Sequence, residues 1–82
     1  MSLPRIFFDT NDGTEPGGYW LGFERSKADL AAHRLAVSDG ARVVIYMPDE
    51  LEIEAVLRFE SSEQVWWADP VPGTLRYLDG TA

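Results

Sequence analysis

The chain has 82 residues, of which 45% are hydrophobic and 12% aromatic, and it carries a formal net charge of -7. This is enough apolar material for one small folded domain, and too much for an intrinsically disordered segment. The basic residues are scattered along the chain. Proteins that bind nucleic acids or anionic membranes need clustered cations, so we expect neither as a partner.

The sequence also narrows the chemistry and the compartment. It has no cysteine and a single histidine, so disulfides, thiolate catalysis and the ligand sets of zinc sites are not expected. No apolar run approaches the roughly 18 residues that a membrane-spanning helix needs, and no secretory leader is visible. From these features we expect a cytoplasmic monomer that holds no metal or cofactor.

The first half of the chain predicts a hairpin followed by one helix. Residues 4–8 and 19–23 are apolar and aromatic, and the segment 9–18 between them is dense in turn-forming residues, so two strands joined by a long loop are predicted. A helix is expected to begin at Ser26, which has capping-box spacing to Asp29, and to end before Gly40. Its small apolar face is formed by Ala28, Ala31, Ala32, Leu35 and Ala36.

The strongest pattern lies in the second half of the chain. Residues 42–47 are β-branched and aromatic, and residues 51–60 alternate strictly between apolar and polar side chains, which is typical of a half-buried strand. The apolar face of that strand consists of Leu51, Ile53, Ala55, Leu57 and Phe59. Turns are expected at 48–50, 61–63 and 70–73, and further short strands at 64–68 and 74–78.

These elements predict a mainly β fold in a single domain, 1–82. We expect five to six antiparallel strands that close into a small barrel at about 40–78, because closure hides the edges of a sheet. The N-terminal hairpin and the one short α-helix, at 4–38, would complete or extend that sheet.

The hairpin 43–59, the Trp66-Trp67 pair and the later Gly73 and Tyr77 resemble an SH3-like barrel over about half of the chain. The sequence is similar to small bacterial domains of this kind. In eukaryotic SH3 domains the first tryptophan of such a pair lines a groove for Pro-rich peptides, which implies a binding role for Trp66. The Ala-Leu-Tyr-Asp-Tyr motif that builds the other wall is absent, so the resemblance implies a topology and no peptide specificity.

Three features that could suggest catalysis or metal binding have simpler interpretations. His33 stands alone on the predicted helix, four residues after Asp29, and is expected to be an exposed residue. Asp9, Asn11 and Gly13 follow part of a calcium-loop spacing, but the ligands that should complete the loop are missing, so a turn is predicted. Four acids crowd residues 49–54, and the two on the strand, Glu52 and Glu54, are expected on its solvated face.

The two adjacent tryptophans must point to opposite faces of their strand. Trp67 shares a face with Val65, and this bulky pair is the better core filler, so Trp66 is predicted to point outward. A bulge between Gln64 and Trp66 would exchange the two tryptophans.

The function predicted from these features is a noncatalytic protein or peptide interaction module. Its partner-binding residues would be Trp66, Tyr46, Glu52 and Glu54, that is, exposed aromatics beside acidic strands. A partner with a Pro-rich, Arg-rich or otherwise basic surface would fit them. The alternative is a small enzyme or small-ligand binder with a cleft between helix and barrel.

Overall fold

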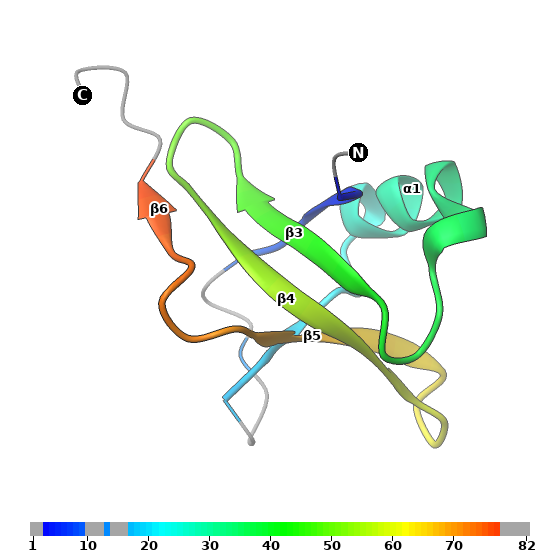
Figure 1. Ribbon diagram of the computed structural model, residues 1–82. Helices are drawn as coiled ribbons and strands as arrows, with labels where there is room; N and C mark the ends of the chain where they lie inside the picture. The colour runs from blue at the N-terminus through cyan, green and yellow to red at the C-terminus, as the bar shows by residue number, and fades with distance from the viewer. Residues whose placement is uncertain (1–2, 10–12, 14–16, 78–82) are drawn as a thin grey trace.

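The computed structural model describes residues 3–9, 13 and 17–77 of the chain. Its elements, in chain order, are β1 (Arg5–Phe7), β2 (Tyr19–Trp20), α1 (Glu24–Ala32), the short 3-10 helix η1 (Arg34–Ala36), β3 (Arg42–Met47), β4 (Leu51–Glu60), β5 (Val65–Pro70) and β6 (Arg76–Tyr77). All six strands belong to one curled sheet, and α1 lies at its β1 end (Figure 1). The predicted mainly β fold with one α-helix is confirmed, in the form of a half-barrel.

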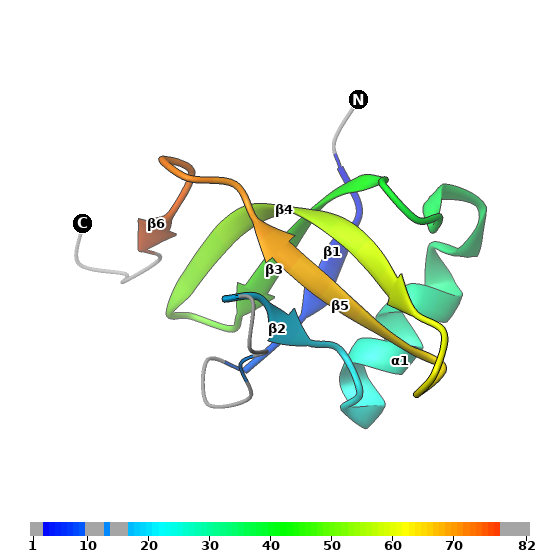
Figure 2. The same ribbon diagram turned by 90° about the horizontal axis from the view of Figure 1, so that it is seen from below.

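The long strand β4 organises the sheet. Its first half pairs with β3 and its second half with β5, so the sheet curls around it (Figure 2). Across the hydrogen bonds the strand order is β1-β3-β4-β5-β2. β1 runs parallel to β3, so the wholly antiparallel sheet expected from the sequence is wrong. A parallel pair needs a long crossover between its strands, and here β2 and α1 lie within that crossover.

The predicted N-terminal hairpin is also wrong, because β1 and β2 lie at opposite ends of the strand order. β1 adds to β3, and β2 adds to β5 through the pair Tyr19–Ala68. The meander of β3, β4 and β5 leaves two edges with unpaired backbone groups, and each edge takes one of the two short strands. Most of the predicted loop 9–18 lies outside the described residues.

The last strand, β6, does not continue the meander as predicted. It pairs with the start of β4 and makes no pair with β5 (Figure 1). The segment that follows β5 turns along β4: the Val71 N–H donates to the Glu54 carbonyl at 2.8 Å, and the Glu54 N–H donates to Thr74 Oγ1 at 3.1 Å. These two bonds lead the chain back to β4.

The predicted alternation of β4 is confirmed. Ala55 and Leu57 are fully buried, Leu51 and Ile53 pack against the core, and Phe59 is 43% exposed at the end of the strand. The complete core consists of Ile6, Phe8, Leu21, Leu30, Val43, Ile45, Ala55, Leu57 and Ala68. We call the face of the sheet that carries these side chains the inner face, and the opposite one the outer face.

The helix covers the free edge of β1. Ser26 is fully buried, and its Oγ donates a 2.6 Å hydrogen bond to the carbonyl of Phe7. The Phe7 N–H donates to Asp29 Oδ2 at 2.9 Å. The predicted capping box of Ser26 and Asp29 is therefore wrong, since α1 begins at Glu24 and both side chains instead satisfy the backbone of an edge strand.

This anchoring also explains why the predicted alanine face of the helix is wrong. Ser26 and Leu30, four residues apart on one side of α1, are its two buried residues. All five residues of the predicted face are exposed, and Leu35, in η1, is 97% exposed. The side of α1 that faces the sheet is therefore the one that carries Ser26 and Leu30.

Gly18 lies where the backbone passes close to a tryptophan. A Cβ atom there would lie 2.4 Å from Cε3 of Trp67 and 2.5 Å from the carbonyl oxygen of Ala68. Gly18→Ala is therefore expected to lower the free energy of unfolding by about 1–3 kcal/mol. Gly22→Ala is the control, since its Cβ would meet Val65 Cγ2 at 3.7 Å and should cost less than about 0.5 kcal/mol. Urea denaturation measures both, and equal losses would contradict the close approach.

Candidate functional site

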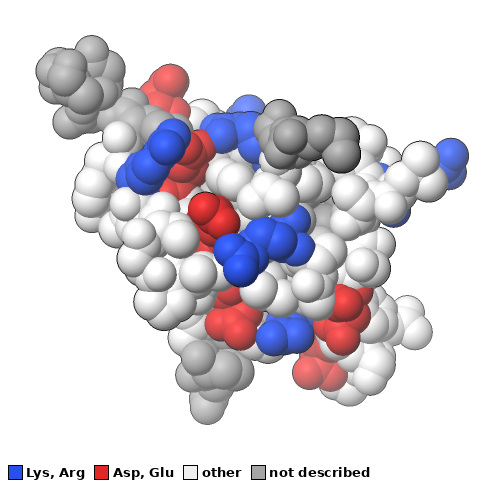
Figure 3. Space-filling view, viewed as in Figure 1, with Lys and Arg blue, Asp and Glu red and all other residues white. Residues whose placement is uncertain are grey.

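The outer face gathers most of the positive charge of an acidic chain. Five of the six arginines lie there: Arg5, Arg25, Arg42, Arg58 and Arg76. Four of them form ion pairs with acids on the same face, Glu52, Glu54 and Asp69. Basic and acidic side chains accordingly alternate over this face, without a large patch of one sign (Figure 3).

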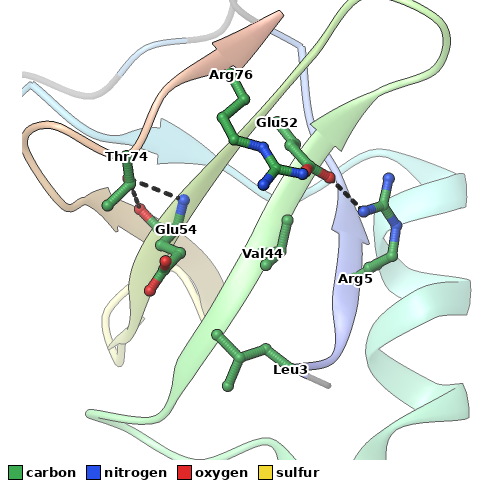
Figure 4. A pocket seen from close by; sticks show the side chains of 7 residues that line it. All are labelled: Leu3, Arg5, Val44, Glu52, Glu54, Thr74 and Arg76. Carbon is green, nitrogen blue, oxygen red and sulfur yellow. Dashed lines mark hydrogen bonds and ion pairs between the residues drawn. The ribbon is translucent and has the colours of Figure 1, made fainter. Parts of the chain in front are cut away.

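A hollow of about 250 Å³ opens on the outer face, between the β1 and β6 sides of the sheet (Figure 4). It is lined by Leu3, Arg5, Val44, Glu52, Glu54, Thr74 and Arg76. Arg5 and Arg76 reach toward Glu52 from opposite sides, and Val44 and Leu3 supply apolar surface (Figure 4). The hollow therefore depends on segments from both ends and the middle of the chain.

Glu52 is held between two arginines. Its Oε2 accepts a hydrogen bond from Nη1 of Arg5, and its Oε1 accepts one from Nη2 of Arg76 at 2.6 Å. The side chain is only 12% exposed. The hydrogen bond from Arg5 lowers the pKa of Glu52 below its ordinary value of 4.5, although burial acts in the opposite direction. The expectation of a solvated Glu52 is wrong, because arginines from β1 and β6 cover it.

Glu54, the next residue on this face, is more open but is also paired. Its Oε1 accepts a 2.8 Å hydrogen bond from Nη1 of Arg42, and its side chain is 41% exposed. Both acids that the sequence predicts as partner-binding residues thus carry ion pairs within the chain.

Tyr46 lies directly opposite Glu52 in the register of β3 and β4. Its ring is flanked by two guanidinium groups: the Cζ atoms of Arg5 and Arg25 lie 4.9 Å and 5.7 Å from the ring centroid, within cation–π range. Its hydroxyl donates to Asp29 Oδ2 at 3.1 Å. Of the four predicted partner-binding residues, the structure brings together Tyr46, Glu52 and Glu54.

Trp66, the fourth, lies on the inner face. It packs against the core and against the ring of Phe59, with ring centroids 5.0 Å apart. Trp67 shares the outer face with its cross-strand partner Trp20, so the predicted orientation of the two tryptophans is wrong. The fully buried residue on the inner side of β5 is Ala68. The cross-strand neighbours of Ala68 are Tyr19 on β2 and Leu57 on β4, and a small side chain fits between these two larger ones.

The residues considered for catalysis or metal binding do not come together in a site among the described residues. His33 is exposed, as expected, while the Asp29 carboxylate turns to Phe7 and Tyr46. Among the described residues, no three His, Cys, Asp or Glu side chains are placed to hold a metal ion. Asn11 of the predicted turn lies outside the described residues.

A second hollow, of about 320 Å³, has a different character. It is lined by Trp20, Glu63 and Val65, of which only Glu63 is charged. It offers little to orient a polar ligand. The hollow at Glu52 is therefore the better candidate site.

Sequence reasoning missed the arginines of this site. Strand alternation alone could have placed Arg42 on the same face as Glu54, because the turn at 48–50 fixes the register of β3 and β4. No local signal indicates that Arg5 and Arg76 meet at Glu52.

The chain was also compared with known proteins. No family model, curated protein or solved structure matches it. In the part of the chain that the structure describes, no helix has the length and apolar character needed to cross a membrane.

The ion pairs of Glu52 predict a loss of stability in acid. Because its pKa is lowered in the folded state, its contribution is full above its ordinary value of 4.5 and is lost as the pH falls through the folded-state pKa. Glu52→Gln is expected to cost about 1–3 kcal/mol at about pH 7. The difference from the wild type should shrink as the pH falls below 4.5 and should be lost once it has passed the lowered pKa of Glu52, where the wild-type carboxyl is also protonated.

Urea denaturation across this pH range measures the effect, with Glu54→Gln as the control. The exposed pair of Glu54 should contribute less than about 1 kcal/mol. The pKa of Glu60 is also lowered, by hydrogen bonds from Ser62, but Glu60 is present in every protein compared, so its effect cancels. A Glu52→Gln difference that did not depend on pH would contradict the assignment.

Proposed function

We propose that the domain is a noncatalytic interaction module that binds a protein segment on the outer face of its sheet. The observation that supports this most is the gathering there of five arginines, in a chain with a single lysine, together with the rings of Phe7, Tyr46, Trp20 and Trp67. Arginine, tyrosine and tryptophan are enriched where protein interfaces gain most of their binding energy, and lysine is depleted there.

The electrostatics of the hollow favour binding over catalysis. A carboxyl group that acts as a general acid needs a raised pKa, near the working pH. The pKa of Glu52 is lowered instead, by its hydrogen bond from Arg5. The alternative of a small enzyme or ligand binder in a cleft between helix and barrel stays a prediction, and residues of α1 line neither of the two hollows described above.

We also infer that the half-barrel is a variant of the SH3-like barrel, with the meander of β3, β4 and β5 as the shared part. The parallel strand β1 would then be an addition to it. The tryptophan of the peptide groove in that family corresponds to Trp66, which lies on the inner face, so the proposed binding face differs from that groove. The basic partner and the cytoplasmic location expected from the sequence stay predictions. The basic partner has lost its main support, because Glu52 and Glu54 are already paired.

A displayed library of random linear peptides, selected on the immobilised domain, tests this function. An enriched peptide would be titrated into the 15N-labelled domain, and its amide shifts should concentrate on β1, β3, the first half of β4 and β6. The variant Arg34→Ala, in η1, should bind equally well and serves as the control. A failure to enrich any peptide, or shifts confined to the segments around Leu35 in η1 and Phe59 at the end of β4, would refute the proposal.

A further inference from the structure

Around the hollow, guanidinium groups outnumber carboxylates. Two arginines that line it, Arg5 and Arg76, share the single carboxylate of Glu52, and the other lining acid, Glu54, is paired with Arg42 outside the hollow. The arginines are also the more accessible, at 49%, 49% and 72% exposure, against 12% for Glu52 and 41% for Glu54. Among the described residues, these three arginines and two glutamates together carry one positive charge that no carboxylate of the group compensates. The next charges along the face, Arg25 and Asp29 beside Tyr46, are one of each sign and do not change the balance.

Among the residues that the structure describes, the two arginines at Glu52 have hydrogen-bond donors that no acceptor takes up. A guanidinium group carries five N–H donors in a fixed plane. Among the described residues, the bond to Glu52 is the one side-chain hydrogen bond that Arg5 and Arg76 each make, through Nη1 and Nη2 respectively. Their remaining donors are available to a second acceptor.

We infer that the hollow binds an acidic side chain, Asp or Glu, of an extended partner segment, with Arg5 and Arg76 as the groups that receive its carboxylate. This rests on the proposed function and names the chemistry of its partner. A carboxylate there neutralises the excess charge and forms charge-assisted hydrogen bonds, which are the stronger kind. Glu52 stays between the two arginines as a positioning residue.

The dimensions and the apolar part of the hollow fit a side chain. Its volume of about 250 Å³ is below the roughly 300–1,000 Å³ of sites that enclose a drug-sized molecule. Leu3 and Val44 add an apolar patch beside the arginines. Side chains two residues apart in an extended segment point to the same side, so we expect an aliphatic residue two positions from the acid.

The net charge of -7 does not oppose this partner at close range. The Debye length at physiological ionic strength is about 8 Å, so acids elsewhere on the surface are largely screened from a carboxylate in the hollow. The arginines that contact it are much closer and are screened less. Because they are partly exposed, added salt should still weaken binding.

The test compares three peptides that differ at one position. Acetyl-Gly-Leu-Ser-Glu-Ser-Leu-Gly-amide is titrated into the 15N-labelled domain, beside peptides with Gln or Arg in place of Glu. The Glu peptide should shift the amides of Val44 and Arg76 and bind at least tenfold more tightly than either of the others. Arg76→Ala should remove most of that difference and Arg76→Lys part of it, since Lys keeps the charge but lacks the planar fork. Arg34→Ala should change nothing, and the amide spectrum of each variant checks that it is folded.

The outcomes separate this inference from the proposed function. Equal affinity for the Glu and Gln peptides, or tighter binding of the Arg peptide, would overturn the inference. If library peptides without an acid still map to the outer face, the interaction module stands and the acidic partner is wrong. If no peptide from either experiment perturbs that face, both are wrong.

Discussion

Leu57→Glu is expected to leave the domain unfolded in neutral buffer without denaturant. Leu57 is fully buried on the inner face of β4, and Ser26 is the one polar side chain among the buried residues described. Of the described residues, none that is buried beside this position carries a cation to pair with a carboxylate. Full burial raises the pKa of an acid by about 3–5 units, so the new carboxyl must take up a proton on folding at about pH 7, which costs about 3–4 kcal/mol. Loss of the packed leucine side chain adds to this cost. A domain of this length has a total stability of only about 4–12 kcal/mol.

The neighbouring residue supplies the control. Arg58 lies on the outer face, where its Nε is 3.9 Å from Asp69 Oδ2, and both side chains are nearly half exposed. Arg58→Gln should change the free energy of unfolding by less than about 1 kcal/mol, as is usual for a surface ion pair. Circular dichroism and urea denaturation report both variants. A folded Leu57→Glu protein, or equal damage from Arg58→Gln, would show that the two faces of β4 are misassigned.

The local parts of the fold could be predicted because their signals lie within a few residues. The period-two pattern of β4 and the turns on either side of it specify the meander of β3, β4 and β5. The partners of β1 and β2 could not be predicted. These strands have three and two residues, and which edge of the meander each one joins depends on the closure of the whole sheet.

The same distinction applies to the candidate site. The β3–β4 register places Tyr46, Glu52 and Glu54 on one face, and this much follows from strand alternation. The arginines at Glu52 come from β1 and β6, and that contact exists only in the folded sheet.

The predicted orientation of Trp66 and Trp67 is wrong for a different physical reason. Trp67 and Val65 would face the core if the core took the larger side chains of β5. Inside a strongly curled sheet the centre of β5 is filled by Ala68, while Trp66 lies partly buried beside it on the same face.

Phe8→Ala is expected to cost about 3–5 kcal/mol, because the ring of Phe8 closes the half-barrel. Phe8 follows β1 directly and is fully buried. Its ring centroid lies 4.9 Å from that of Tyr19 on β2, so this contact joins the two ends of the strand order. The Phe8 N–H donates to the carbonyl of Tyr46 at 3.1 Å, which fixes its backbone beside β3. A cavity between two sheet ends that are each held by hydrogen bonds cannot easily collapse.

Phe59→Ala is the matched control, since it removes the same ring from the end of β4, where it is 43% exposed. It should cost less than half as much, because the ring loses less buried area and packs mainly against Trp66. Urea denaturation gives both values, and equal losses would contradict a closing role for Phe8. Hydrogen exchange adds a second readout: Phe8→Ala should lower the protection of amides in β1 and β2 more than in β4, because the sheet then opens from its ends. A uniform loss of protection would mean that Phe8 stabilises the core without closing the barrel.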